Sequence, residues 1–445
     1  MSGIMMAAIG NWKSAAAASG PTPFDFINPP QLVSASFSGS NWLSMNTGVT
    51  IGAGAYTVEG WAYFTSASLP GVMLSTLTAS NSGFSLLIFS ATEIRIDQNG
   101  VAQNAYTVPT MANNTWHHIA VTRDSSGNET VFVDGVRSST GTTATNYNFS
   151  GASAGVGKFN TGGQWWFTGR FSNIRAVVGS NVYDPTASTI TVPTNPLTAV
   201  ANTAVLLSLG NTPFIDTTGV KTITNNSAVA LVNSSPFAAT WTDSISGIIA
   251  TVATGVNATN NPTYDALYGG GLNVAQTAQT YVDVPTTYNG AAGFTISMAA
   301  NIPQAQGSHY VGIFDGNTID RTGAYINSRQ WVGDGLEVGT QGAWGASNST
   351  TDPAMATLAW WDFVYNGRFI SVYKNASLVT GFNNYDMGVA NTGWLNPLRC
   401  AGDESVSAGN MMWPGTLYRA KLQAGALNST QITAQFAIVR STYGL

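Results

Sequence analysis

Apolar and polar residues alternate with a period of two along most of the chain. Ala55–Tyr63 (AYTVEGWAY) and Asn128–Val136 (NETVFVDGV) follow this pattern and are bounded by Gly, Asn or Asp, as β-strands usually are. Asp134 and Gly135 separate two short apolar runs and fit a type I′ hairpin turn. The pattern therefore predicts an all-β protein built from antiparallel strands.

A helical period is clear only near the C-terminus. There Asn428 or Ser429 can cap a helix whose Ile432, Phe436 and Val439 share one face. The chain has 445 residues, too many for one ordinary core, so two domains of about 200 residues each are expected.

Three segments of the first half recur in the same order in the second half. The matched segments are GAYTVEGWAYF from Gly54 with AGFTISMAANI from Ala292, the strand from Trp116 with the strand from Trp360, and Phe167-x-Gly169-x-Phe171 with Trp413-x-Gly415-x-Leu417. A recurrence in one order predicts a duplication. We expect an N-terminal arm (1–30), a first sandwich (31–238) and a second sandwich (239–445).

Several of these segments resemble a known family. Tyr56–Trp61, Trp116–Thr122, the Val-Asp-Gly hairpin and Phe167–Arg175 are similar to laminin-G-like domains of the concanavalin-A-like lectin/glucanase group. Thr191–Phe237 resembles the closing segment of such domains in tailed-phage virion proteins. The resemblance implies two tandem antiparallel jelly-roll-like β-sandwiches, although the second has Trp361-Asp362 where the two His residues of the first would stand.

Charge and hydropathy exclude some classes of protein. Charged residues make up 8% of the chain, and its 16 Lys and Arg form no basic run, so nucleic-acid binding is not expected. The sequence contains no stretch of about 18 apolar residues, so membrane insertion is not expected. Because Lys13 follows the apolar Ile4–Ile9 instead of preceding it, we expect synthesis and assembly in the host cytoplasm. The single Cys400 forms no intramolecular disulfide and is expected to be buried.

No catalytic residue is predicted. Glucanases of the resembling group use a Glu-x-Asp-x-Glu strand, and none of the five Glu residues here has a second Glu within four positions. The nearest approach is Glu93 with Asp97, a pair expected to face solvent, with Arg95 between them. His117 and His118 point to opposite faces of a strand, and His309 has no partner visible in the sequence.

The resemblance also implies that calcium could bind at a rim, through Asp carboxylates and backbone carbonyls. The candidate ligands are Asp97, Asp124 and Asp134 in the first sandwich, and Asp315, Asp320 and Asp334 in the second. An Asp at a β-turn is ordinarily there for a turn hydrogen bond, so the prediction is no cofactor, with calcium as the alternative.

Aromatic residues are the best candidates for ligand binding, because sugars stack on flat apolar rings. Alternation places Trp165 and Phe167 on the core face and turns Trp166 outward, after a loop that includes Asn160 and Gln164. Trp344 and Trp394 lie in Gly/Asn-rich loops and are the next candidates; such residues can instead seal a subunit interface.

Together these features predict a non-enzymatic virion protein of a tailed phage, displayed on a tail, fibre or capsid surface and adhering to host glycans. An arm containing Ile4, Met5, Met6 and Trp12 would anchor it to other virion proteins. A homo-oligomer is expected, with a trimer preferred. The alternatives are an architectural decoration protein without a ligand and a polysaccharide-degrading enzyme.

Overall fold

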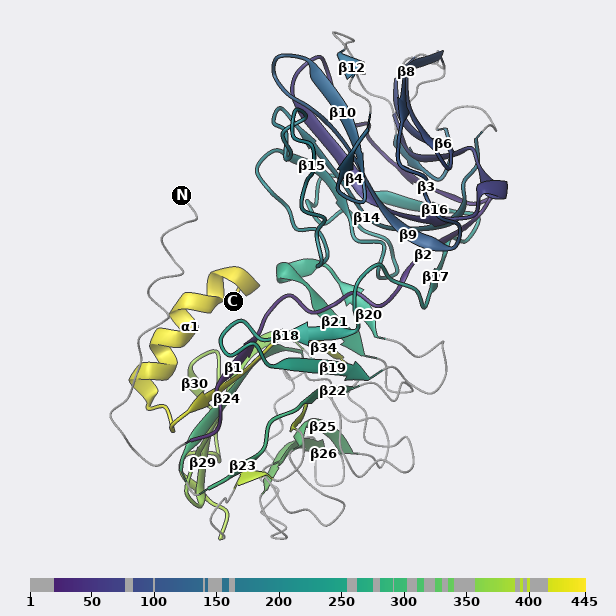
Figure 1. Ribbon diagram of the computed structural model, residues 1–445. Coiled ribbons are helices and arrows are strands. Elements are labelled where there is room, and N and C mark those ends of the chain that lie inside the picture. The colour runs from purple at the N-terminus through teal and green to yellow at the C-terminus, as the bar shows by residue number, and fades with distance from the viewer. Residues whose placement is uncertain are drawn as a thin grey trace. The chain divides into compact units, whose positions relative to one another are not determined.

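The computed structural model describes residues 20–76, 83–98, 101–138, 141–142, 154–159, 165–253, 262–274, 281–290, 292–301, 310–315, 325–329, 335–339, 357–388, 393–394, 398–400 and 415–445 (Figure 1). The fold is nearly all β, as the alternation predicts. The chain forms two compact units. The first sandwich is Asn28–Ala239 with Gly255–Asn273, and the second is Met1–Ile27, Thr240–Thr254 and Val274–Leu445.

The first sandwich pairs its strands into two antiparallel sheets. The β4 sheet has the order β11 (Val136–Arg137), β10 (Asn128–Val133), β9 (Thr115–Arg123), β4 (Tyr56–Phe64), β14 (Thr168–Val178), β2 (Ser34–Ser38) and β17 (Ala230–Val232), with β12 (Gly141–Thr142) on β10 and β15 (Thr203–Leu207) on β14. The β6 sheet has the order β16 (Ile223–Asn226), β3 (Trp42–Met45), β13 (Ala154–Val156), β5 (Gly71–Ser75), β6 (Phe84–Ser90), β7 (Glu93–Gln98) and β8 (Val101–Thr107). A 3-10 turn, η1 (Ser66–Ser68), precedes β5.

The second sandwich repeats this plan. Its β24 sheet contains β34 (Gly415–Ala424), β24 (Phe294–Ala300), β28 (Ala359–Asn366), β29 (Phe369–Lys374) and β30 (Ser377–Leu378), with β31 (Tyr385–Asp386) on β29. Its other sheet has the order β18 (Thr240–Thr242), β19 (Ile249–Ala253), β22 (Tyr281–Val284), β33 (Leu398–Cys400), β25 (Tyr310–Asp315), β26 (Tyr325–Arg329) and β27 (Gly335–Gly339). The remaining elements are the β20 (Thr263–Asp265) and β21 (Gly271–Val274) hairpin with η2 (Leu267–Gly269) between its strands, the β23 (Tyr288–Asn289) and β32 (Gly393–Trp394) pair, and helix α1 (Ser429–Tyr443).

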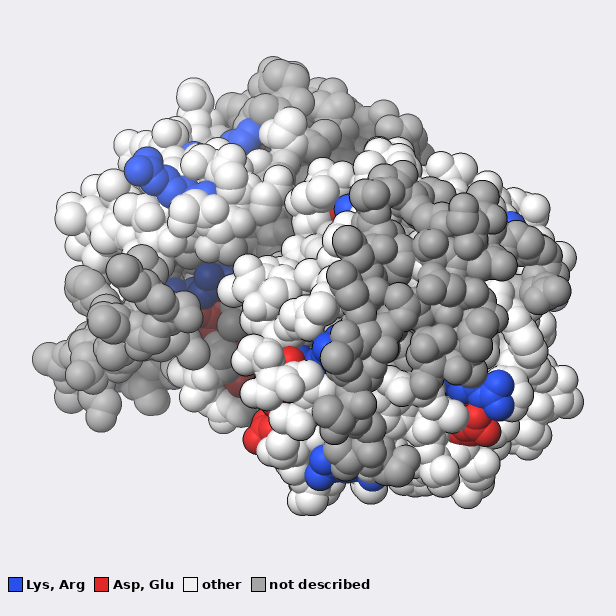
Figure 2. All heavy atoms as spheres, turned by 90° about the horizontal axis from the view of Figure 1, so that it is seen from above, with Lys and Arg blue, Asp and Glu red and all other residues white. Residues whose placement is uncertain are grey.

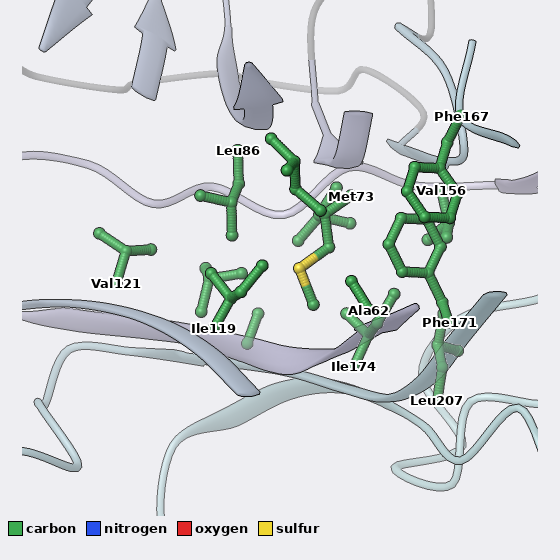
Figure 3. Packing of buried hydrophobic residues seen from close by; sticks show 14 of the residues in the cluster. Ala62, Met73, Leu86, Ile119, Val121, Val156, Phe167, Phe171, Ile174 and Leu207 are labelled. Atoms are coloured by element: carbon green, nitrogen blue, oxygen red, sulfur yellow. The ribbon is translucent and has the colours of Figure 1, made fainter. Parts of the chain in front are cut away.

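The core of the first sandwich lies between its two sheets (Figure 3). Met73 of β5 extends into the middle of this layer, among Leu86, Ile119 and Ile174. Alternate residues of each strand point inward, so one face of each sheet is removed from water, which is the main stabilising contribution to such a fold.

The Phe-x-Gly-x-Phe motif has a direct packing explanation. Phe167 and Phe171 stack with ring centroids 3.9 Å apart and an interplanar angle of 16°. A Cβ on Gly169 would lie 2.3 Å from the Tyr63 carbonyl oxygen and 2.8 Å from the Phe167 ring. Only glycine therefore lets β4 and the stacked rings approach this closely.

The alternation predicted at the start of this motif is wrong at one residue. Trp165 does not join Phe167 in the core; it packs with Phe89 and Phe159, beside Leu87. Leu87 lies on the outer face of the β6 sheet, whereas its neighbours Leu86 and Ile88 face the core. The cause is the left-handed backbone at Trp165 (φ 60°), which interrupts the extended geometry before β14 begins.

The first strand of the chain belongs to the second sandwich. β1 (Phe24–Phe26) pairs antiparallel with β34 and appears as a purple strand among green and yellow ones in Figure 1. Phe24 and Phe26 are fully buried, and the Arg419 side chain donates from Nε to Asp25 Oδ1 at 2.7 Å. The predicted arm (1–30) thus includes a core strand of the second sandwich.

Strand register shows which residues of the two sandwiches are equivalent. Glu59 faces Arg175 across β4 and β14, and Ser297 faces Lys421 across β24 and β34, so the first and third matched segments are aligned as predicted. The middle match is wrong by two residues. The His118 amide donates to Asp134 Oδ1, and the Asp134 amide donates to the His118 carbonyl. Trp360 and Asn375 form the same two hydrogen bonds, with Asn375 in the place of Asp134.

Trp360 therefore takes the place of His118, not of Trp116. The hairpins that follow have the same geometry. Asp134 (φ 50°) and Gly135 (φ 81°) form the predicted type I′ turn, and Asn375 (φ 50°) with Ala376 (φ 62°) forms its counterpart.

Candidate functional site

A buried ionic cluster occupies the outer face of the β4 sheet. Glu59 is fully buried, with Oε1 3.0 Å from Arg175 Nε and Oε2 3.2 Å from His118 Nε2. Tyr183 donates its hydroxyl to Glu59 Oε2 at 2.8 Å. Burial alone would raise the pKa of Glu59, but the hydrogen bond from His118 and the charge of Arg175 outweigh burial and lower it.

The segment that follows β14 covers this cluster. Arg175 Nη1 donates to the Thr198 carbonyl at 2.7 Å, and Leu197 packs with Trp61 and Phe237. A carboxylate sealed in this way stabilises the covering segment and is closed to a substrate. The sequence analysis did not predict the cluster, because it depends on strand order and not on any local motif.

The second sandwich has a related cluster under its C-terminal helix. Asp362 Oδ1 accepts hydrogen bonds from Ser297 Oγ (2.6 Å), Trp360 Nε1 (3.1 Å) and Gln435 Nε2 (2.8 Å). Lys421 Nζ donates to Gln435 Oε1 at 2.8 Å. Lys421 is on β34, the strand equivalent to the β14 strand of Arg175. The carboxylate differs in position: Glu59 is on β4, whose counterpart is β24, whereas Asp362 is on the neighbouring strand β28.

A third group of side chains is half-buried and not sealed. Lys158 Nζ lies 3.8 Å from the centroid of the Trp42 ring and 4.8 Å from that of Trp166. Trp42 begins β3, directly after the turn from β2, and Trp166 precedes β14. We call Trp42, Lys158 and Trp166 the Trp–Lys cluster. It is the described group best suited to a ligand, because it offers two indole rings and a cation together.

A similar arrangement lies on the outer face of the β4 sheet. The Arg170 guanidinium is 4.5 Å from the Tyr63 ring centroid, and Tyr63 packs at 5.6 Å on Trp116. All three side chains are partly exposed. Charged residues make up only 8% of the chain, and on the face shown in Figure 2 the blue and red side chains form small separate groups among white residues.

Comparison with known family models finds a similarity within the first sandwich. Residues 37–180 match the family model described as the concanavalin A-like lectin/glucanases superfamily. This segment of the first sandwich is therefore similar to that superfamily. The matched segment includes the Trp–Lys cluster and ends near the close of β14.

Solved structures with a similar fold include a Bacteroides ovatus protein described as carbohydrate binding (TM-score 0.35, 16% identity, 48% of this chain and 62% of that one). They also include a heptameric SAP-like pentraxin from Limulus polyphemus (0.33, 16%, 44% and 95%) and domains LG4-5 of the mouse laminin α1 chain (0.27, 12%, 94% and 95%). This chain spans 62% of the length of the Bacteroides protein. No curated protein matches it.

The predicted metal ligands of the first sandwich are not brought together among the described residues. Asp134 accepts from the His118 amide at 2.9 Å and lies 2.7 Å from His117 Nδ1, so it holds the hairpin. Asp124 accepts from the amides of Ser126 and Asn128, as a turn residue does. In the described part of the chain no three His, Cys, Asp or Glu side chains could share a metal ion. The prediction of no cofactor, with calcium as the alternative, stays a prediction.

The expectation that Glu93 and Asp97 both face solvent is wrong for Asp97. Asp97 is 6% exposed, and desolvation raises its pKa despite the nearby charge of Arg95. Glu93 is half-exposed and forms an ion pair with Arg95 at 2.6 Å.

Trp394 is not an exposed ligand-binding residue. It is 1% exposed, donates from Nε1 to the Thr286 carbonyl at 2.9 Å and packs with Tyr288 and Phe294. Its Gly and Asn neighbours suggested a surface loop, but β32 places it in the core. Trp166 is half-buried and belongs to the Trp–Lys cluster. Sequence reasoning missed Trp42 and Lys158, which are brought together only by the pairing of β3 with β13.

Several predicted residues lie outside the described ranges: Asn160, Gln164, Trp344, His309, Asp320, Asp334, Ile4, Met5, Met6 and Trp12. Asp315 lies in β25, whose side chains are not described. Cys400 is buried, as expected, and desolvation raises its pKa to about 12. The described helix is too short to cross a membrane.

Proposed function

We propose that this protein is a non-enzymatic virion protein of a tailed phage, displayed on the particle, that adheres to host-surface glycans through the Trp–Lys cluster. The observation that carries the adhesion is the pair of partly exposed indole rings, Trp42 and Trp166, whose centroids lie 3.8 Å and 4.8 Å from Lys158 Nζ. Sugar rings stack on such surfaces while nearby polar groups orient their hydroxyls. The cluster lies in the segment matched to the lectin/glucanase family, which supports a carbohydrate ligand.

The Glu residues support a non-catalytic role. Retaining glycosidases need two carboxyl groups about 5 Å apart beside the substrate. Among the described side chains, Glu59 and Glu129 are fully buried and Glu93 is held by Arg95. Glu129 accepts from the hydroxyls of Tyr56 and Tyr106 inside the core. Glu59 and Glu129 are thus closed to a polysaccharide, and the Glu93 carboxylate is already paired with Arg95.

The virion assignment rests on the resemblance of Thr191–Phe237 to phage proteins and on the low-charge surface. A particle would display many copies in a symmetric arrangement, a homotrimer in our proposal. Multivalent display turns weak single-site sugar contacts into firm attachment. The partners are then other virion proteins and host-surface glycans.

A glycan array probed with the assembled full-length protein tests the adhesion. We expect selective retention on a subset of glycans, lost in Trp42→Ala and Trp166→Ala. Phe369→Ala is the matched control, because Phe369 is also an exposed ring with an Arg above it, but lies in the second sandwich. Retention of no glycan by the oligomer would replace adhesion with a purely architectural role.

Two further measurements test the rest of the proposal. Antibodies against the protein should label intact particles, and absence of label would refute display. Incubation with host capsule should release no reducing ends. Release that is abolished by a single Asp or Glu substitution would make the protein a polysaccharide-degrading enzyme.

A further inference from the structure

Lys158 and Arg170 of the first sandwich each lie over an aromatic ring and have no carboxylate partner among the described residues. Lys158 lies over the Trp42 ring and near the Trp166 ring, and Arg170 lies over the Tyr63 ring. The described residues that form ion pairs include neither of them. By contrast, Arg95 and Arg175 of the same sandwich are each paired with a Glu.

The two cations belong to the same end of the sandwich. Phe167, next to Trp166, donates its amide to the Gly157 carbonyl and accepts from the Gly39 amide, so the segments that carry Lys158, Trp42 and β14 meet there. Arg170 follows Trp166 by four residues, a span of at most about 14 Å along the chain. Trp42 and Lys158 lie on the outer face of the β6 sheet and Arg170 lies on that of the β4 sheet, so a polysaccharide that contacts both cations must run over this end of the sandwich.

Holding a half-buried cation without a counter-charge has a cost. Desolvation lowers the pKa of Lys158, because burial disfavours the charged form of the amine. The ring contacts offset part of it and fix the direction of the ammonium, so an incoming anion would meet a donor that is already oriented. A carboxylate would complete the site through charge-assisted hydrogen bonds, which are stronger than neutral ones.

We propose that the first sandwich binds an acidic polysaccharide, with sugar rings on Trp42 and Trp166 and with carboxylates of the glycan paired to Lys158 and Arg170. The inference rests on the proposed function and adds the substrate class: glycans that contain uronic acids or other carboxylated sugars. A neutral glycan would leave both cations unpaired on binding and would lose these two interactions.

Calorimetric titration of the full-length protein with polygalacturonate fragments tests this. The matched probe is the same fragments after carboxyl reduction, which removes the charge and keeps the ring. At about 0.15 M salt we expect the acidic fragments to bind and the reduced fragments to bind at least tenfold more weakly, as expected for losing one charge-assisted hydrogen bond.

Variants of the two cations locate the site. Lys158→Met and Arg170→Met keep much of the apolar side chain, and each should weaken binding of the acidic fragments about tenfold. Lys158→Arg keeps the charge and should retain binding. Arg368→Met is the control, because Arg368 also lies over a ring but in the second sandwich, and it should leave affinity unchanged. Thermal unfolding of each variant shows that the fold is intact.

Other outcomes overturn the inference in distinguishable ways. Equal affinity for acidic and reduced fragments, with loss in Trp166→Ala, would leave glycan adhesion intact and remove acidic selectivity. Equal binding of a single-stranded oligonucleotide would show general attraction of polyanions in place of sugar recognition. If the wild type bound neither fragment and no glycan on the array, both this inference and the adhesive function would be wrong.

Discussion

Gln435 of α1 donates from Nε2 to Oδ1 of Asp362 on β28, and this contact ties the C-terminal helix to the outer face of the β24 sheet. The helix begins at the predicted Asn428 cap, and its buried residues include Ile432 and Val439. Gln435 adds a polar contact to this apolar face. The charged groups near the contact are Lys421, Asp25 and Arg419.

The buried carboxyl at this contact should make the second sandwich sensitive to pH. Burial raises the pKa of Asp362 to about 6, outweighing its hydrogen bonds from Ser297, Trp360 and Gln435 and the charge of Lys421. Between its unfolded value of 3.8 and about 6 the native state binds more protons, so the free energy of unfolding falls as pH rises through that window. We expect a loss of at most roughly 3 kcal/mol, measured by urea unfolding at several pH values. In Asp362→Asn this loss should be absent; equal slopes in variant and wild type would contradict the assignment.

The Glu59 cluster should be far more sensitive to substitution than a surface pair. Glu59→Gln leaves the buried Arg175 without its counter-charge, which typically costs about 3–5 kcal/mol. Glu93→Gln, which breaks the half-exposed pair with Arg95, should cost less than about 1 kcal/mol. Chemical denaturation of both variants makes the comparison. Similar losses would mean that Glu59 is better solvated than its burial indicates.

The two type I′ turns should respond oppositely to exchange of Gly and Ala. Gly135→Ala places a Cβ 2.6 Å from the Ile190 carbonyl oxygen at φ 81°, so it should destabilise the first sandwich by about 2 kcal/mol or more. Ala376→Gly relieves a left-handed alanine (φ 62°) and should stabilise the second by about 1 kcal/mol. Differential scanning calorimetry reports both. Destabilisation by Ala376→Gly would show that the alanine methyl contributes more than its backbone strain.

His117 should titrate above the ordinary range. Its pKa is raised: desolvation opposes the charged form, but hydrogen bonds to Asp134 and to the Ala112 carbonyl outweigh it. The stabilisation is fully present below pH 6.5, the ordinary pKa of an unfolded histidine, and is lost as pH rises through the raised pKa. An NMR titration of the His117 ring should show this shift, and Asp134→Asn should reduce it. An unchanged pKa in that variant would remove Asp134 as the cause.

Truncation separates the predicted anchor from the core strand. Deleting residues 2–27 removes Phe24, Phe26 and the Asp25 partner of Arg419, so the second sandwich should unfold at lower denaturant concentration. Deleting residues 2–19 spares β1 and should leave stability unchanged while reducing incorporation into particles. Full incorporation of this shorter deletion would place the anchor elsewhere.

The sequence predicted what depends on local pattern. Alternation predicted β4 and β10 closely, and Asp134-Gly135 predicted its turn. The alignment of the two halves failed where it relied on matching tryptophans. Trp116 was matched with Trp360, but the hairpin hydrogen bonds show that Trp360 is equivalent to His118.

Burial and long-range contacts were beyond local patterns. Trp394 has loop-like neighbours yet lies in the core. Lys158 meets Trp42 only because β13 pairs with β3, and Glu59 meets Arg175 only because β4 pairs with β14. The residues that flank these side chains in the sequence do not predict either strand pairing.

The placement of β1 affects the order in which the chain can fold during synthesis. Asp25 emerges early but its partner Arg419 comes 394 residues later. At roughly 5–20 residues per second, the ribosome needs on the order of 20–80 s to deliver that partner. All described strands of the first sandwich are translated in this interval, so that sandwich can be complete while Phe24 and Phe26 still lack β34. The second sandwich closes only when the last strand arrives, and until then its first strand is a candidate for chaperone binding.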